Sequence, residues 1–293
     1  MSWLTDPIAW WIIPFTDNPF LRDALWAALL SVLCTSVIGT WVVLRGLSFL
    51  GDALSHGVLP GIAIAVVVGG NTTIGALVAA LAMVGGVHLI RNASPLPDDA
   101  SIGVLFVGFL ALAVVVMSAQ DGRGAGDLTR FLFGSINAVD GTDLRTLMIV
   151  AVITVGAVIV LHRALLVGTF DPTQARLIGF RPELTHFVLL VLLALSIVAS
   201  FETVGSLLVF AFLIAPPATA SLLVRRVSLM MITAVVIGAI SALIGILVSY
   251  HHDTATGATM ALVTVVAFIA VLLVQQGYRG ITRWRAGVRS AYV

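Results

Sequence analysis

One apolar stretch of the chain reads Ser48-Phe-Leu-Gly-Asp52-Ala-Leu-Ser-His56-Gly-Val-Leu-Pro60-Gly-Ile-Ala-Ile-Ala. Its length and composition are typical of a helix that crosses a bilayer. Asp52 and His56 are four residues apart, so in a helix they lie on the same face. An ionisable side chain in the hydrocarbon costs a few kcal/mol, and such residues usually have a partner or a function. The stretch therefore predicts both a membrane span and a candidate site within it.

The composition extends this prediction to the whole chain. Of the 293 residues, 60% are hydrophobic and 10% are charged, and the mean hydropathy is +1.13. Soluble domains have about a quarter charged residues, so we expect an all-α integral membrane protein. Long apolar runs without period-2 alternation exclude a β-barrel. The expected spans are 22–44, 47–69, 73–91, 101–119, 144–162, 185–201, 206–224, 229–250 and 257–276.

All fifteen basic residues are arginine, and the chain contains no lysine. A P-loop ATPase needs a lysine in its phosphate-binding loop, so this chain cannot hydrolyse ATP by that route. If ATP drives a function here, another subunit must hydrolyse it. The single cysteine, Cys34, excludes a disulfide framework, and no basic patch indicates a nucleic-acid partner.

The placement of arginine sets the expected orientation. Alternating the nine spans puts eleven arginines on one side and only Arg22, Arg123, Arg130 and Arg145 on the other. The positive-inside rule makes the first side cytoplasmic. We expect one membrane domain, 1–293, with an interfacial tryptophan-rich segment at 1–20 and a cytoplasmic tail at 277–293. A helix over 127–134 is expected in the outer interface.

The cytoplasmic loop 168–182 predicts a short capped helix. Asp171 suits the N-cap, Pro172 the first helical position and Gly179 the position after the C-cap. A helix of under two turns is marginal alone in water. It is therefore expected to pack against the bundle's own underside or against a partner.

Two proline motifs fall inside expected spans. Pro60-Gly61 and Pro216-Pro217 are each predicted to interrupt a helix. Such interruptions can flank a transport pathway or be simple packing kinks.

Other ionisable residues lie near the expected membrane surfaces. On the outer side, Glu202, His251, His252 and Asp253 could capture metal, or could be a helix end and a solvated turn. His88, His162 and His186 lie near cytoplasmic helix ends, where an exit-path role competes with simple interfacial placement.

The Asp52–His56 pair has a functional and a structural interpretation. A carboxylate and an imidazole are common ligands of divalent transition metals. Counting about 1.5 Å per residue from Gly46 places His56 about 15 Å deep, near the middle of the bilayer. The alternative is a pair that is hydrogen-bonded internally or to a neighbouring span.

Several of these motifs together carry a family resemblance. The chain resembles the membrane permeases of ABC importers for zinc, manganese or iron(II). The match covers about residues 20–275 in five stretches that follow the family's order: Leu44–Gly61, Phe131–Gly134, Phe170–Gly179, Val204–Ala220 and Ser249–Thr259. It implies a type II ABC importer-like permease, a polytopic bundle of about 8–9 transmembrane helices.

The resemblance also implies a function and a set of partners. The protein would be the non-enzymatic transmembrane subunit of an ATP-driven importer of Zn²⁺ or Mn²⁺, possibly Fe²⁺, in the bacterial cytoplasmic membrane. It would form a homodimer, bind two cytoplasmic P-loop ATPase subunits, and receive metal from an extracytoplasmic binding protein. Transport would proceed by alternating access, with no permanently bound cofactor.

The family's site residues map onto this chain by position. Its Asp-x-x-x-His element falls on Asp52 and His56, as metal-coordinating or gating residues. Its ATPase-coupling element falls on Phe170, Asp171, Pro172, Ala175 and Gly179. One departure is Glu202, where members often carry a neutral residue.

Two other classes of function remain as alternatives. One is a carrier that works alone on an ion gradient, which a neighbouring ATPase gene and a metal-binding lipoprotein gene would argue against. The other is an intramembrane hydrolase that uses Asp52 and His56 with a metal. It would need a third ligand, which the sequence does not locate.

Overall fold

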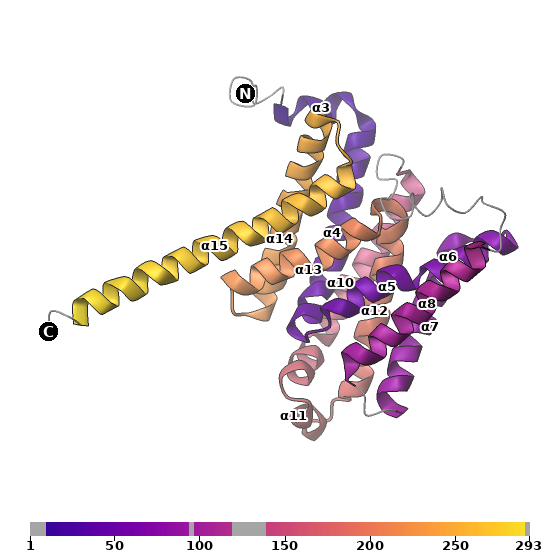
Figure 1. Ribbon diagram of the computed structural model, residues 1–293, viewed down its shortest axis with the longest axis horizontal. Coiled ribbons are helices and arrows are strands. Elements are labelled where there is room, and N and C mark those ends of the chain that lie inside the picture. The colour runs from indigo at the N-terminus through magenta and orange to yellow at the C-terminus, as the bar shows by residue number, and fades with distance from the viewer. Residues whose placement is uncertain (1–9, 94–96, 119–138, 291–293) are drawn as a thin grey trace.

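The computed structural model describes residues 10–93, 97–118 and 139–290, which form a helical bundle (Figure 1). Nine helical segments of this part of the chain are long and apolar enough to cross a membrane. They match the nine expected spans to within three residues, except that the fifth span, expected to end at 162, continues to Phe170, and the all-α prediction is confirmed for the described residues. The elements are α3 Ile13–Asp17, α4 Pro19–Leu44, α5 Ser48–Gly57, α6 Leu59–Val68, α7 Thr72–Ala93, α8 Asp98–Ser118, α10 Gly141–Phe170, α11 Pro172–Leu177, α12 Pro182–Val204, α13 Ser206–Leu223, α14 Val227–His252 and α15 Thr256–Ser290. The helix expected at 127–134 lies outside the described residues.

Helix α4 is the centre of the bundle. It contacts α10, α12, α13 and α14. Of the residues in its most apolar 18-residue stretch 72% are buried, against 17% in the corresponding stretch of α8. Hydroxyl side chains along it donate to backbone carbonyls one turn earlier, as Thr35 does to Ser31 at 2.6 Å and Thr40 to Ser36 at 2.9 Å. These bonds satisfy polar groups that would otherwise be costly inside the membrane.

The second span consists of two ten-residue helices. Gly46, with φ of +69°, ends α4, and a tight turn then starts α5 at Ser48. Helix α5 ends at Gly57 and α6 begins at Leu59, with Pro60 in its first turn. The helix thus breaks at Val58, two residues before the proline, because Pro60 has no N–H to donate to the carbonyl of His56. The interruption expected at Pro60-Gly61 is present.

Helix α6 packs closely against α7 through reciprocal glycine contacts. A Cβ on Gly61 would lie 2.0 Å from the carbonyl oxygen of Gly75, and a Cβ on Gly75 would lie 2.3 Å from that of Gly61. Ala65 and Ala79, one turn further along each helix, border the same contact. Small residues four apart allow this backbone approach in membrane helices. Gly61 therefore has a packing role in addition to its place after the break.

Helix α13 is continuous, so the interruption predicted at Pro216 and Pro217 is absent. Neither proline can donate to the carbonyl one turn earlier, which leaves those of Phe212 and Leu213 without their usual helical partners. The Ser36 hydroxyl of α4 donates to the Phe212 carbonyl at 3.1 Å. Gly39 of α4 lies against the Leu213 carbonyl, where a Cβ would come within 1.9 Å of the oxygen. Helix α4 therefore supplies a donor for the Phe212 carbonyl, and its glycine allows the backbone to approach the Leu213 carbonyl closely.

The two ends of the bundle differ in structure. Helix α3 lies at the end opposite α11, beside the loop that joins α14 and α15 (Figure 1). The expected cytoplasmic tail is not a separate segment in the described residues: α15 continues as one helix to Ser290 and extends away from the bundle (Figure 1).

Candidate functional site

Asp52 and His56 lie on one face of α5, at the end of that helix. His56 Nε2 is 3.6 Å from Asp52 Oδ1, and the two side chains keep 27% and 33% of their surface exposed. A distance of 3.6 Å is too long for a hydrogen bond and is within the distance of an ion pair when the imidazole is protonated. Both groups are accessible from outside the single chain, unlike the core residues Leu50 and Leu54 of the same helix.

The separation of the pair suits a shared metal ion. Metal bonds of about 2.1 Å place nitrogen and oxygen ligands roughly 3.0–3.4 Å apart across a tetrahedral or octahedral ion. The observed 3.6 Å is close to that range, so a small side-chain rotation would bring both atoms into coordination distance. In the described residues no group of three or more His, Cys, Asp and Glu side chains comes together as a metal site. Further ligands for an ion at this pair must therefore come from water, backbone carbonyls or another chain.

Aromatic rings and a helix break lie next to the pair. The ring of Phe106 from α8 lies 6.0 Å from that of His56 and 6.0 Å from that of Phe49. Directly after His56 the backbone changes from α5 to α6. Backbone carbonyls at interrupted membrane helices are well suited to bind cations, and the break places such carbonyls beside the imidazole.

The outer candidate residues whose side chains the structure describes do not form a metal-ligand group with this pair. The His251 ring stacks on Trp10 at 4.5 Å, and its Nε2 lies 3.2 Å from the Trp10 carbonyl oxygen, so the N-terminal segment already contacts it. His252 and Asp253 are exposed at the end of α14. Glu202 lies near the end of α12, and its side chain is outside the described part of the structure.

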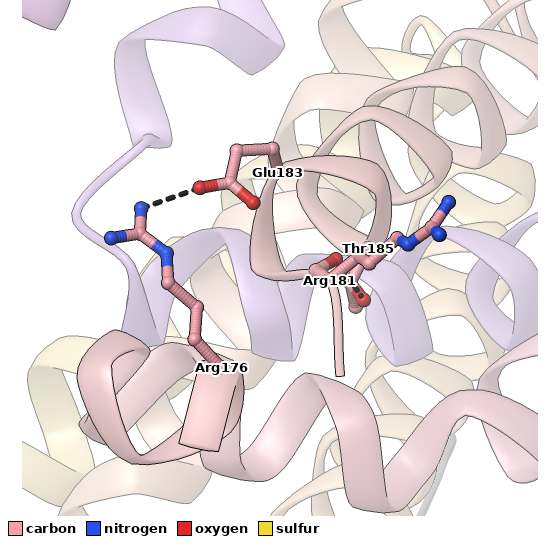
Figure 2. A network of polar contacts seen from close by, with 4 residues as sticks. All are labelled: Arg176, Arg181, Glu183 and Thr185. Atoms are coloured by element: carbon pink, nitrogen blue, oxygen red, sulfur yellow. Dashed lines mark hydrogen bonds and ion pairs between the residues drawn. The ribbon is translucent and has the colours of Figure 1, made fainter. Parts of the chain in front are cut away.

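Helix α11 has the caps that the sequence predicts. The Asp171 carboxylate accepts a hydrogen bond from the Gln174 N–H at 2.8 Å, Pro172 is in the first turn, and Gly179 has a φ of +88°. Ala175 is fully buried against the bundle. Arg176 forms an ion pair with Glu183 at the start of α12, which ties α11 to the bundle (Figure 2). The short helix is thus held in place at both ends and in the middle.

Apolar side chains are exposed at both ends of α11: Phe170 is the last residue of α10, Leu177 the last of α11 and Ile178 its C-cap. Phe170, Leu177 and Ile178 have 64%, 82% and 52% of their surface exposed. The helix is at one end of the bundle, beyond α10 and α12 (Figure 1). Exposed apolar side chains that flank a projecting helix are typical of a surface that binds a partner.

The histidines predicted near cytoplasmic helix ends have local partners that the sequence did not indicate. Arg45 donates from Nη1 to His186 Nδ1 at 2.9 Å and from Nε to the Thr169 hydroxyl at 2.9 Å. The His88 ring lies 5.5 Å from the ring of Phe187. His162 contacts Trp41 edge to face at 5.6 Å, and its Nε2 lies 3.3 Å from the Ser228 hydroxyl. These contacts join residues far apart in the chain, and sequence spacing contains no signal for them.

These features define a class of protein: a polytopic helical membrane protein with an intramembrane Asp–His pair and a capped helix that projects at one end. Residues 17–275 match the family described as the ABC 3 transport family. The chain belongs to this family, whose permeases serve ABC importers of metal ions.

Named relatives and solved structures agree with this assignment. The chain is 39% identical over 254 residues to a manganese transport system membrane protein, MntC, from Listeria monocytogenes, covering 86% of this chain and 90% of the relative. It is 33% identical to the chelated iron transport system membrane protein YfeD of Yersinia pestis, covering 87% of this chain and 85% of that relative. The structure titled PsaBC from Streptococcus pneumoniae in complex with Fab superposes with a TM-score of 0.80 at 31% identity, covering 90% of this chain and 95% of that one.

A more distant structure supports the fold alone. It is titled as an inward-facing conformation of a putative metal-chelate type ABC transporter, and it superposes with a TM-score of 0.66 at 17% identity. It covers 84% of this chain and 84% of its own.

Proposed function

We propose that this permease imports a divalent transition metal, Mn²⁺, Zn²⁺ or Fe²⁺, with Asp52 and His56 as its intramembrane ligands. The observation that carries the proposal is the accessible pair at a helix break, separated by 3.6 Å without a hydrogen bond. A carboxylate and an imidazole replace water ligands of these ions. The MntC and YfeD relatives, named for manganese and for chelated iron, support metal as the substrate class.

We further propose that ATP hydrolysed by partner subunits drives transport by alternating access. The chain has no lysine for a P-loop. Its capped α11, together with the exposed Phe170 before it and Leu177 and Ile178 at its end, supplies a surface for a cytoplasmic ATPase. A homodimer with two ATPase subunits and an extracytoplasmic metal-binding protein would complete the importer. Movement of α11 would reach Arg45 and then α5 through the Thr169 contact.

The coordinating role is tested by metal accumulation. Cells that express the complete importer take up ⁵⁴Mn²⁺ or ⁶⁵Zn²⁺, and uptake is normalised to the permease in the membrane. Asp52→Asn and His56→Gln should each lower uptake on the order of tenfold or more, because loss of a ligand weakens binding of the ion. His162→Gln, which removes a histidine that packs against Trp41 instead, is the matched control. Wild-type uptake by both site variants would refute the assignment.

The energy source is tested separately. Uptake should stop when the P-loop lysine of the partner ATPase is replaced, and should continue when an ionophore dissipates the proton gradient. The opposite result would indicate a gradient-driven carrier.

A further inference from the structure

A polar cavity of about 290 Å³ lies between α11 and the cytoplasmic ends of α4, α7, α10 and α12. It does not include the Asp52–His56 pair. Its lining residues are Arg45, His88, Arg91, Gly168, Pro172, Arg176, Pro182, Glu183 and His186. The volume is close to the lower end of small-ligand sites, roughly 300–1,000 Å³.

The charge of the cavity wall is strongly positive. Arg45, Arg91 and Arg176 contribute three guanidinium groups, and Glu183 is the one acidic residue among the described residues that line it. Glu183 is paired with Arg176, and three arginines with one glutamate give the lining residues a net charge of +2 when the histidines are neutral. Burial and the nearby Arg91 guanidinium lower the pKa of Arg45 to about 10, so Arg45 stays charged at neutral pH while it repels Arg91.

The hydrogen bonds around Arg45 prepare the cavity for an acceptor. An arginine only donates, so His186 accepts from Arg45 through Nδ1 and, as a neutral ring, carries its proton on Nε2. Arg45 and His186 both line the cavity. The remaining N–H groups of Arg45 and the Nε2–H of His186 are hydrogen-bond donors, and neither residue adds negative charge. The contacts with Thr169 and His186 also fix the guanidinium in position.

The cavity is placed within reach of the lipid surface. His88 and Arg91 are in the last turns of α7, where Leu89 between them is 68% exposed. Helix α7 is at the periphery of the bundle, since only 33% of the residues in its most apolar 18-residue stretch are buried. Basic pockets between helices at the cytoplasmic surface are well suited to anionic headgroups.

We propose that this cavity binds a phosphate-bearing anion, either the headgroup of an anionic phospholipid or a free phosphate compound. Guanidinium groups match phosphate oxygens in charge and geometry. The anion would contact Arg176 on α11, Arg45 in the turn that precedes α5, and Arg91 on α7. It would thereby connect α11, the turn before α5, and α7.

Thermal unfolding of the full-length permease in an uncharged maltoside detergent tests this binding directly. The probes are dihexanoyl phosphatidylglycerol and inorganic phosphate, with dihexanoyl phosphatidylcholine and chloride at matched ionic strength as references. At about ten times its Kd, a bound probe should raise Tm on the order of 3 °C. Arg91→Gln and Arg176→Gln should abolish most of this shift.

The matched control is Arg181→Gln. Arg181 is absent from the cavity lining, and its side chain extends away from the Arg176–Glu183 pair (Figure 2). It should retain the full shift, which separates binding at the cavity from a general loss of positive charge.

Each outcome decides the proposal. A shift with phosphatidylglycerol alone assigns a lipid headgroup, and a shift with inorganic phosphate assigns a free anion; both support the site. No shift with either probe, or an equal shift in wild type and Arg91→Gln, overturns it. Loss of ATPase-subunit copurification in Arg91→Gln without any probe shift would assign the cavity to a protein carboxylate and also overturn it. This assay does not depend on metal uptake, so its failure would leave the proposed transport function intact.

Discussion

The contact between Gly39 and α13 gives the sharpest stability prediction. In the Gly39→Ala variant the new Cβ would lie 1.9 Å from the carbonyl oxygen of Leu213, 2.8 Å from its carbonyl carbon and 3.2 Å from its Cα. All three are backbone atoms, so no rotamer change can relieve the clash. Restoring a van der Waals distance of about 3.5 Å requires α4 and α13 to separate by roughly 1.5 Å.

That separation also affects a neighbouring hydrogen bond. The Ser36 hydroxyl is 3.1 Å from the Phe212 carbonyl, and a shift of this size takes it beyond hydrogen-bond distance. Overpacking costs about 1–3 kcal/mol, and a buried carbonyl without its partner costs about 1 kcal/mol more. We therefore expect Gly39→Ala to lower the free energy of unfolding by about 2–4 kcal/mol.

Equilibrium unfolding in mixed micelles, followed by circular dichroism during a titration with sodium dodecyl sulfate, measures this change. Gly156→Ala is the matched control, since a Cβ there meets no atom within 4 Å and alanine favours a helix over glycine. The control should be as stable as wild type or slightly more stable. If Gly39→Ala loses no more stability than Gly156→Ala, the close approach of the two helices is not a constraint and the reasoning fails.

Two further predictions follow from named hydrogen bonds. Ser36→Ala should cost about 1 kcal/mol in the wild-type background and close to nothing alongside Pro216→Ala, because the restored N–H then serves the Phe212 carbonyl. The same micelle titration of a double-mutant cycle measures this coupling, and additive effects would contradict it. Asp171→Ala should destabilise α11 by about 1 kcal/mol and reduce metal uptake per ATP hydrolysed. Asp140→Ala, which removes the N-cap of α10, should lower stability comparably and leave that ratio unchanged; equal uncoupling by both would count against a special role for α11.

Local patterns in the sequence predicted the helices well. Apolar runs longer than the bilayer thickness set the nine spans, and the caps at Asp171 and Gly179 predicted a helix that the structure places at Pro172–Leu177. These features depend on residues within one or two turns of each other. The Asp52–His56 spacing likewise predicts a shared helix face, which the 3.6 Å separation confirms. Metal binding by the pair remains a proposal.

Features that depend on distant residues could not be predicted in this way. Pro60 and Pro216 both predict an interruption, but the structure breaks only the first helix. The difference arises from Ser36, which is 176 positions from Phe212 and supplies the missing donor. The pairing of Arg45 with His186 spans 141 positions and is equally invisible in local sequence.

The break at Val58 has a mechanical consequence. Helices α5 and α6 both pack on α7 and α8, but only α5 also packs extensively on α12 and α13. If α12 and α13 move relative to α7 and α8, we expect the angle between α5 and α6 to change at Val58, the one residue that separates the two helices. Asp52 and His56 are both on α5, so such bending would move the two side chains together relative to α6 and α7. A single joint at Val58 would thus displace the whole pair as one unit without unfolding either half-helix.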